Sequence, residues 1–365
     1  MSDLNFTSVR ELAAKIARRE VSATEVIEAY LSQIERHNHK LNAIVTLDEE
    51  GARAAARGAD EALERGQAPG ALHGVPVTIK DSLETAGLRT TAGFPPLGAY
   101  IPTVDATVVS RVRQAGAIIL GKTNLPLLSG DYQSSNPIFG RSNNPWDLDR
   151  TPGGSTGGGA AAVAAGLSAL ELGSDLGGSL RGPAHCCGLC TIMATNQRIS
   201  RAGHIPELPG APKGLRFAGV MGPIARSVGD LRLALRLLAG PDDRWWEVPP
   251  VPLEDPPGRS LQDLRIAWTD DFGGVPITAG TQAGLFELAA ALGQAGATVK
   301  RSFPQDFDLH VAWETFGELM SAETGSAMSP EAELARAETF GVGPEAGDPM
   351  ERGLLSGINA SMRLV

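Results

Sequence analysis

Short apolar segments alternate with amphipathic segments along the chain, and this alternation constrains the fold more than any other feature. Val75, Val77 and Ile79 alternate with other residues as in a strand, and two later apolar runs have the length of buried strands, at 117–123 and 169–175. Helical patterns flank them at 8–20, 22–38, 49–65, 105–116 and 159–166. Alternating strands and helices predict an α/β fold with a central mixed sheet.

The same alternation resumes near the end of the chain. We expect a helix at 228–240, a strand at 264–268, a helix at 278–296 and a strand at 297–303. A proline-rich stretch, 242–258, interrupts this series. Because α/β elements follow it, the sequence predicts a surface excursion there rather than a linker between domains.

Two of the expected helices carry start signals in their first residues. Ser8 and Glu11, and again Ser22 and Glu25, have the spacing of a capping box, in which each side chain satisfies a backbone N–H near the helix start. The sequence therefore predicts helices that begin directly after Ser8 and Ser22.

The charge and hydropathy of the chain exclude two classes of partner. The formal net charge is −10, so the chain lacks the basic footprint of a protein that binds nucleic acid directly. No apolar run approaches the roughly 18 residues of a membrane span, and the N-terminus has no apolar signal-peptide core. We expect a cytoplasmic protein without membrane contact, and a homodimer is left open.

The three cysteines, Cys186, Cys187 and Cys190, lie within five residues of one another. A structural zinc site needs four ligands around a tetrahedron, and His185 would have to supply the fourth from the same short segment. The spacing favours buried free thiols over a metal site.

The segment 116–123, GAIILGKT, matches the phosphate-binding pattern G-x-x-x-x-G-K-T. That loop follows a strand and uses flexible residues to surround phosphate. Here a helical pattern precedes the match, and the intervening Ala, Ile, Ile and Leu favour a strand. The sequence therefore favours a buried strand over a nucleotide site.

Three side chains from separate segments suggest nucleophilic catalysis. Lys80 ends a predicted strand, Ser155 lies in a glycine-rich loop, and Ser179 follows the glycines of the segment GSDLGGS. A serine needs a base to take its proton, and a neutral lysine can act through a bridging hydroxyl. Backbone N–H groups around glycines can hold an oxyanion. Taken alone, the segment GSDLGGS is equally consistent with a simple turn.

In combination these segments resemble the amidase signature family, the amidases with a Ser-cisSer-Lys triad. The blocks GVPVTIKD, TPGGSTGGGAAAVAAG and GSDLGGSLRGPA occur in the family order, and Ser155 and Ser179 stand 24 positions apart, as in the family. The phrases GKTNLP and NPIFGRSNNPWDLDRTPGG are also family-like. The resemblance spans 9–303 and is most specific at 72–184.

The resemblance implies a role for each matching residue. Ser179 would be the acyl-forming nucleophile, Ser155 the bridging hydroxyl after a cis peptide bond with Gly154, and Lys80 the terminal base. The amides of Leu176, Gly177, Gly178 and Ser179 would form the oxyanion hole. Thr156 stands where the family has a second serine, and Asp175 and Arg181 would brace the loops. The resemblance also implies helices on both faces of the sheet, and it requires no cofactor or metal.

For Lys80 to act as a base, its ammonium must lose a proton near neutral pH. Desolvation against the sheet can lower the lysine pKa from about 10.4 to about 7. Asp81 would oppose this shift if it paired with Lys80. Successive side chains of a strand point to opposite faces, so we expect no such pair.

The chain departs from the family pattern at two places. Thr191, Ile192, Met193 and Ala194 replace a Gly-Leu-Lys-Pro-containing block, and Gln197 stands where glycine is usual, so a positive φ there would add strain. The chain stops at GINASMRLV, inside an expected helix, where family members continue with a segment that adds a strand and lines the pocket. We expect one amidase domain over 1–365, truncated at its C-terminus, with N-terminal helices at 1–70, a signature core at 71–225 and a variable α/β part at 226–365.

Three functions remain open on this sequence. The first is a stand-alone amidase that hydrolyses a small-molecule carboxamide to a carboxylate and ammonia or an amine. The second is the glutaminase (A) subunit of a glutamyl-tRNA amidotransferase, in which partner subunits would contact the RNA. The third is a catalytically impaired fragment or binding protein on the same scaffold. The diverged C-terminal half favours the first.

Overall fold

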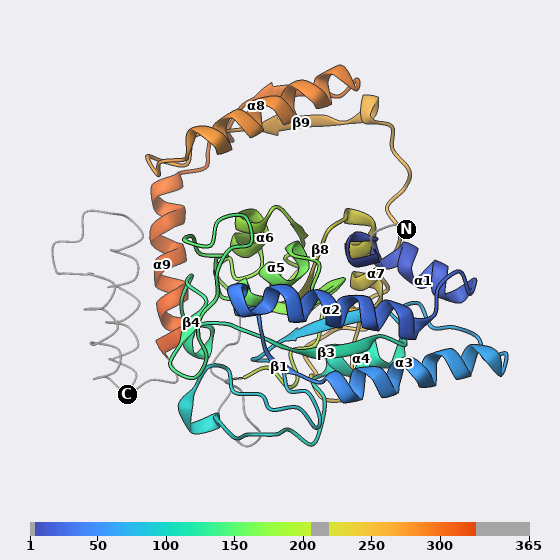
Figure 1. Cartoon of the computed structure of the whole chain (residues 1–365). Coiled ribbons are helices and arrows are strands. Elements are labelled where there is room, and N and C mark those ends of the chain that lie inside the picture. The colour runs from blue at the N-terminus through green and yellow to red at the C-terminus, as the bar shows by residue number, and fades with distance from the viewer. Residues whose placement is uncertain (1–3, 206–218, 326–365) are drawn as a thin grey trace. The chain divides into compact units, whose positions relative to one another are not determined.

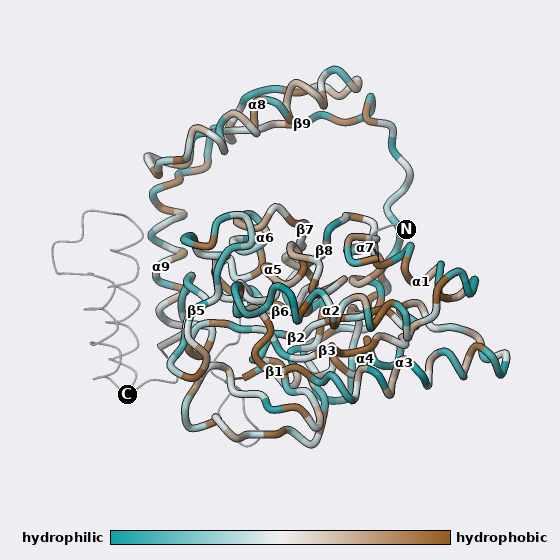
Figure 2. The backbone as a smooth tube through the Cα atoms, viewed as in Figure 1, coloured by the Kyte–Doolittle hydropathy of each residue, from teal (hydrophilic) through white to brown (hydrophobic). Residues whose placement is uncertain are grey.

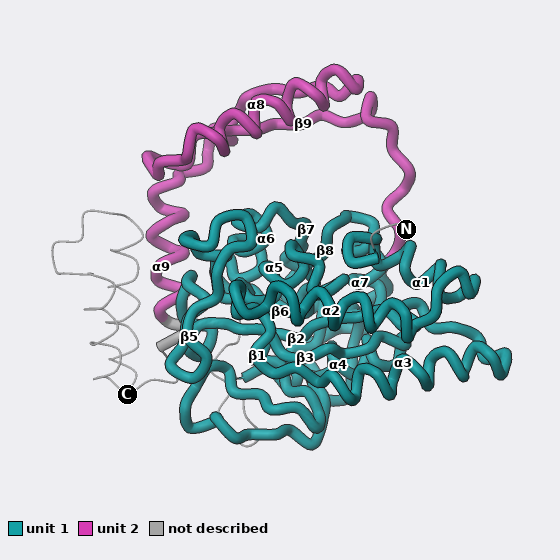
Figure 3. The backbone as a smooth tube through the Cα atoms, in the orientation of Figure 1, with its two compact units in different colours: residues 1–253 teal, residues 254–365 magenta. Residues whose placement is uncertain are grey.

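The computed structural model describes residues 4–205 and 219–325, with side chains to residue 321. The chain divides into two compact units, residues 1–253 and residues 254–365 (Figure 3). The boundary falls inside the proline-rich stretch 242–258. This differs from the expected excursion within one domain, because the stretch separates the two units. A single amidase domain over the whole chain stays a prediction.

The first two helices begin where the sequence predicts. Helix α1 is Val9–Ala17, and Ser8 accepts a hydrogen bond from the amide of Glu11. Helix α2 is Ala23–Leu41, and Ser22 and Glu25 form both halves of a capping box. At Ser8 only the serine half of that motif is present.

The remaining described helices match the expected segments and add two. They are α3 Glu49–Glu64, α4 Thr107–Gln114, α5 Gly157–Ala164, α6 Arg181–Cys187, α7 Val228–Leu238, α8 Ala279–Gln294 and α9 Leu309–Gly325 (Figure 1). Short 3₁₀ helices occur at Leu4–Phe6, Pro95–Leu97, Leu127–Ser129 and Leu261–Asp263.

The central sheet of the first unit has six strands in the order β1-β3-β2-β6-β8-β7. Strand β2 pairs in parallel with β3 and β6, whereas the β1–β3, β6–β8 and β8–β7 pairs are antiparallel, so the predicted mixed sheet is confirmed. The strand bounds are β1 Ile44–Leu47, β2 Pro76–Lys80, β3 Ile118–Thr123, β6 Leu170–Asp175, β7 Cys190–Thr191 and β8 Val220–Ala225. A separate hairpin joins β4 Ser135–Asn136 to β5 Gly140–Arg141.

Strand β3 contains most of the segment 116–123, which matches the phosphate-binding pattern. The residues that match the pattern after Ala117 form a fully buried strand between β1 and β2, preceded by helix α4. Their backbone groups pair with neighbouring strands. This segment therefore has the predicted strand structure and not that of a phosphate-binding loop.

The core of the first unit lies along the middle of this sheet. Every residue of β2, β3, β6 and β8 is buried, and Figure 2 shows hydrophobic residues concentrated along the sheet. Helix α5 lies on one side of the sheet and α4 on the other (Figure 1). A Cβ on Gly159 of α5 would lie only 2.2 Å from Cδ of Glu171 in β6, so this glycine permits the close packing of helix on sheet.

The second unit contains its own small sheet. Strands β9 Arg265–Trp268 and β10 Thr298–Arg301 pair in parallel, and α8 connects them in the chain. Both strands lie where the sequence predicts. Among the described residues they form a two-stranded sheet of their own and do not extend the central one.

No helix within the described residues is long and apolar enough to cross a membrane. The segment 357–365, where the sequence suggests an interrupted helix, lies outside the residues that the structure describes.

Candidate active site

Lys80 is the last residue of the central strand β2, and its side chain is fully buried. Its Nζ lies 2.7 Å from Oγ of Ser155 and 3.0 Å from Oγ of Ser174. Ser155 lies two residues before the start of α5, and Ser174 lies in the neighbouring strand β6. The sheet and the glycine loop thus bring together the predicted base and the predicted bridging hydroxyl, which are 75 residues apart in the chain.

Burial of Lys80 destabilises the protonated, charged form of its side chain. Desolvation lowers the pKa of Lys80 to about 7, and the nearby carboxylates of Asp175 and Glu171 only partly oppose it. A substantial fraction of the side chain is therefore the neutral amine near pH 7, as expected from the sequence. Such an amine can accept a proton from Ser155.

Asp81 does not pair with Lys80, as predicted from strand geometry. One oxygen of its carboxylate accepts hydrogen bonds from the amide and the hydroxyl of Thr91, at 3.0 and 2.5 Å. Within the described part of the chain no ion pair joins it to Lys80. Lys80, the predicted base, is thus free of a direct carboxylate partner that would hold it protonated.

The glycine-rich loop positions Ser155 through its backbone. The peptide bond between Gly154 and Ser155 is cis, and Gly153 adopts a φ of +83° that favours glycine. A Cβ on Gly154 would lie 2.6 Å from the carbonyl carbon of Tyr132, so the loop passes against the 131–134 segment without room for a side chain. Ser134 bridges this loop, because its hydroxyl donates to Gly153 O and accepts from the amide of Gly157.

Ser179 lies between β6 and α6 and is partly exposed. Its backbone carbonyl accepts a hydrogen bond of 3.1 Å from the amide of Thr156, which joins its loop to the glycine loop next to Ser155. The Thr156 hydroxyl donates to the carbonyl of Ser174. Among the described residues no hydrogen bond links the hydroxyls of Ser155 and Ser179, so that step of the relay stays a prediction.

Asp175 and Arg181 hold the loop between them, the bracing role expected from the sequence. Arg181 donates two hydrogen bonds to the Asp175 carboxylate, at 2.9 and 3.0 Å, and the amides of Gly178 and Leu180 donate to it as well. Burial raises the pKa of Asp175, but these hydrogen bonds outweigh it and hold the pKa below its usual value. The ionised carboxylate therefore organises the turn that carries Ser179.

The amides of this turn differ from the expected oxyanion hole in one respect. The N–H of Gly178 donates to Asp175 at 2.8 Å, so in this structure it is engaged within the loop. In the described part of the chain no protein group accepts the amides of Leu176, Gly177 and Ser179. These three N–H groups are the ones that can meet a developing oxyanion.

Three residues that touch this site had no role predicted from the sequence. The hydroxyl of Tyr132 donates to the carbonyl of Gly177 at 2.8 Å. Ser174, inside the quoted motif, accepts from Lys80, and Nε2 of His204 lies 2.9 Å from the Ser174 hydroxyl oxygen. His204 in particular was missed. Its segment, RAGHIP, carries no motif that would reveal the contact.

Glu171 is a second buried ionisable group on the same face of the sheet. Burial raises its pKa to about 7, against the hydrogen bonds that its two oxygens accept from Thr78 and Thr123, both at 2.6 Å. It joins β2, β3 and β6 side by side. Its hydrogen bonds to both hydroxyls indicate a structural role next to Lys80.

The cysteines differ in part from the expected buried thiols. All three are free, but only Cys187 is buried, whereas Cys190 is half-buried and Cys186 is exposed on α6. Burial raises the pKa of Cys187 to about 12, so its thiol is unreactive. No group of three or more potential metal ligands occurs among the described residues.

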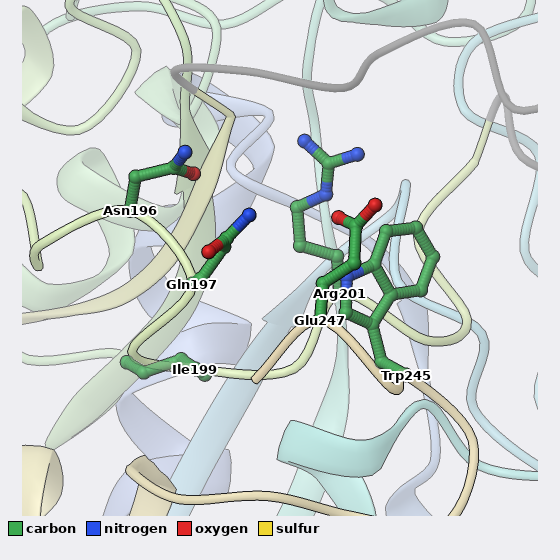
Figure 4. Close-up of a pocket in the computed structure, with 6 residues that line it drawn as sticks. All are labelled: Asn196, Gln197, Ile199, Arg201, Trp245 and Glu247. Carbon is green, nitrogen blue, oxygen red and sulfur yellow. The ribbon is translucent and has the colours of Figure 1, made fainter. Parts of the chain in front are cut away.

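The diverged segment contributes to a pocket whose lining contains none of the predicted triad residues. Gln197 has a φ of +61°, so it occupies the left-handed region where glycine was expected, and the backbone is strained there. The pocket is lined by Asn196, Gln197, Ile199, Arg201, Trp245 and Glu247 (Figure 4). The Arg201 guanidinium lies over the Trp245 ring, 4.9 Å from its centroid.

The sequence of this chain is similar to those of known amidase-family proteins. The Amidase family model matches residues 25–357. The A subunit of the glutamyl-tRNA(Gln) amidotransferase of Carboxydothermus hydrogenoformans is 43% identical over 242 residues, covering 66% of this chain and 48% of the relative. The indoleacetamide hydrolase of Bradyrhizobium diazoefficiens is 37% identical over 324 residues, covering 87% and 60%. The chain thus spans about half to three fifths of the length of these relatives.

Solved structures of amide-hydrolysing proteins and of an amidotransferase A subunit have the same fold as this chain. A fatty acid amide hydrolase superposes with a TM-score of 0.80 at 28% identity, over 98% of this chain and 58% of that one. The A subunit of the glutamyl-tRNA(Gln) amidotransferase of Thermotoga maritima gives a TM-score of 0.76 at 25% identity, over all of this chain and 75% of the other. With its mixed sheet, its signature blocks in order and the family match over most of its length, the chain belongs to the amidase signature family.

Proposed function

We propose that the chain hydrolyses a carboxamide through a serine acyl-enzyme. Ser179 is the nucleophile, Ser155 passes the proton, and Lys80 is the base. The observation that carries this proposal is the 2.7 Å contact between a buried lysine with a pKa of about 7 and the Ser155 hydroxyl. A lysine in that state can accept a proton at neutral pH.

The reaction proceeds in two halves. The Ser179 oxygen attacks the amide carbon while its proton moves through Ser155 to Lys80, and the free amides of Leu176, Gly177 and Ser179 stabilise the oxyanion. The tetrahedral intermediate collapses, and the leaving amine or ammonia takes the proton back from Lys80. Water then attacks the acyl carbon and gives its proton to the same base. The bond from that carbon to the Ser179 oxygen breaks, Ser179 takes the proton back from Lys80 through Ser155, and the acid product is released and ionises to the carboxylate.

Labelling with a fluorophosphonate tests this assignment. The probe should form a covalent bond to Ser179, and mass spectrometry of the digested protein should locate it there. The Ser179→Ala variant should lose labelling, while the control Ser135→Ala, an exposed serine on strand β4, should keep it. Undiminished labelling of Ser179→Ala would remove the nucleophile from the proposal.

A second candidate function is glutaminase activity within an amidotransferase. The specific observation in its favour is that several curated relatives, including those from Carboxydothermus hydrogenoformans and Streptomyces coelicolor, are the A subunits of glutamyl-tRNA(Gln) amidotransferases. We place the stand-alone amidase first, because the segment after Ser179 departs from the family pattern. Ammonia release from glutamine that requires added partner subunits would reverse this order.

The third candidate, a catalytically impaired scaffold, is tested with the same preparation. A panel of aryl, aliphatic and amino-acid amides is incubated with the chain and with Ser179→Ala, and released amine is measured. Turnover above the variant's level on any amide supports the enzyme. Cooperatively folded protein that neither turns over nor reacts with the fluorophosphonate supports the impaired scaffold.

A further inference from the structure

A chain of buried polar groups runs from the predicted base away from Ser155. The Lys80 amine contacts the Ser174 hydroxyl at 3.0 Å, and that hydroxyl lies 2.9 Å from Nε2 of His204. The Ser82 hydroxyl lies 3.3 Å from the same nitrogen. All four side chains are buried, with His204 the most exposed at 7%. The base therefore has hydrogen-bonding groups on two sides, Ser155 on one and the Ser174–His204 pair on the other.

Backbone pairing holds His204 in this place. His204 forms an antiparallel β-bridge with Leu83. On either side of this bridge, the amide of Ile205 donates to Ser82 O at 2.8 Å, and the amide of Glu84 donates to Gly203 O at 2.9 Å. The partner segment, residues 82–84, follows Lys80 almost directly. The imidazole is thus fixed to the same stretch of backbone as the base.

The surroundings keep the imidazole uncharged. Burial, together with the positive charges of Lys80 and Arg201, lowers the pKa of His204 to about 3. The charged groups that act on Lys80 from the neighbouring strand are Asp175 and Glu171. A neutral imidazole with its proton on Nδ1 presents Nε2 as a hydrogen-bond acceptor.

The direction of the Ser174 hydroxyl decides whether the lysine can work as a base. A neutral lysine has two N–H donors and one lone pair. If the Ser174 O–H donates to His204, its oxygen accepts an N–H from Lys80, and the lone pair stays available to Ser155. If the Ser174 O–H turns to Lys80 instead, it occupies that lone pair and blocks proton transfer from Ser155.

We propose that His204 is a positioning residue for the catalytic lysine: by accepting the Ser174 hydroxyl hydrogen, it keeps the lone pair of Lys80 directed at Ser155. This inference rests on the proposed function, since it assigns the orientation of the base in that reaction. It adds to the triad a residue that never touches the substrate.

Two substitutions at this position separate hydrogen bonding from packing. His204→Leu fills the site without an acceptor, whereas His204→Gln places an amide oxygen near the position of Nε2. We expect the maximal rate of fluorophosphonate labelling to fall about tenfold in His204→Leu, the effect of one lost hydrogen bond, and to recover most of that loss in His204→Gln. For amide turnover the loss should appear in kcat, with KM unchanged.

The pH response provides a readout that a packing defect would not move. In His204→Leu the Ser174 hydroxyl has Lys80 as its acceptor, which favours the neutral amine. The midpoint of the pH–rate curve should therefore move to lower pH by about one unit even as the plateau falls. NMR of ¹³C-labelled lysine, with the Lys80 signal assigned by Lys80→Met, should show the same downward shift in the Lys80 titration, with or without activity.

His73→Leu is the matched control, because His73 is also buried but its Nε2 contacts the carbonyl of Ala59, outside this chain of groups. It should lower stability without changing the labelling rate per folded molecule or the titration of Lys80. The inference about His204 is overturned if His204→Leu keeps the wild-type plateau and the wild-type Lys80 titration. Wild-type protein that is inert to the probe contradicts the proposed function instead, while the NMR titration still decides the hydrogen-bond arrangement.

Discussion

Two helices of similar composition, one in each unit, have opposite environments. Helix α5, GGGAAAVA, is buried from Gly157 through Val163. Helix α8, AGTQAGLFELAAALGQ, is also rich in glycine and alanine, yet none of its residues is buried. The strands differ in the same way, since β6 is buried throughout whereas β10 has no buried residue.

The difference shows that local composition predicts an element but not its burial. Helix α5 contacts five strands of a six-stranded sheet, and its glycines let it approach them closely. Helix α8 contacts the β10 strand of a two-stranded sheet. Ionisable groups with shifted pKa values, such as Lys80 and Glu171, lie in the large sheet, because a wide, covered sheet can remove a side chain entirely from water.

The largest expected effect compares one lysine from each unit. Lys80→Met should lower the rate of amide hydrolysis and of fluorophosphonate labelling by about 10²- to 10⁴-fold, the usual contribution of a general base. Lys300→Met, in the exposed strand β10, should leave both rates unchanged. Stopped-flow or gel-based labelling measures this, and equal rates for Lys80→Met and the wild type would contradict the assignment of the base.

The pH dependence should follow from the burial of the first unit. Because burial lowers the pKa of Lys80 to about 7, the ammonium form dominates below that pH and the neutral amine above it. The labelling rate should rise through pH 7 and level off, and below the midpoint it should fall about tenfold for each pH unit. A midpoint near the ordinary lysine value would show that the site hydrates in solution.

A pair of glycine substitutions tests the contrast between the two helices directly. Gly159→Ala places a Cβ 2.2 Å from Cδ of Glu171, whose side chain is held by Thr78 and Thr123, and should lower the free energy of unfolding by about 1–3 kcal/mol. Gly284→Ala in α8 meets no atom within 4 Å and should stabilise its helix by about 1 kcal/mol.

Hydrogen exchange followed by mass spectrometry assigns each change to its own unit. Faster exchange in β2 and β6 should accompany Gly159→Ala, and slower exchange in α8 should accompany Gly284→Ala. The same sign of effect in both variants would show that the two helices have similar environments in solution.

The smallest expected effect concerns an exposed contact within the first unit. Tyr132→Phe removes the hydrogen bond to Gly177 O and should reduce kcat by about two- to tenfold, since one net hydrogen bond contributes about 0.5–1.5 kcal/mol. The fold should be unaffected, because the Tyr132 side chain is half exposed. Steady-state kinetics with a chromogenic amide measures the change, and a loss as large as that of Lys80→Met would assign Tyr132 a direct role.

Much of the first unit was predictable because its signals are local. Ser22 and Glu25 cap α2 three residues apart, and alternation or apolar runs mark β2, β3 and β6 within a few residues. The ordered signature blocks also predicted which segments would meet at Lys80 and Ser155. The division into two compact units was not predicted. A proline-rich stretch such as 242–258 has the same composition whether it crosses the surface of one domain or lies between two units.

The sequence by itself determined helices α1–α5, α7 and α8, strands β2, β3, β6, β9 and β10, and the residues of the predicted triad, since capping, periodicity and motif spacing act between near neighbours in the chain. Only the tertiary structure decided which groups share a hydrogen-bond network. His204 meets Ser174 across 30 residues, and the Gly178 amide turns to Asp175 rather than to the expected oxyanion hole. Burial decided the protonation of Lys80 as well, because desolvation depends on every element packed around a side chain and not on its neighbours in sequence.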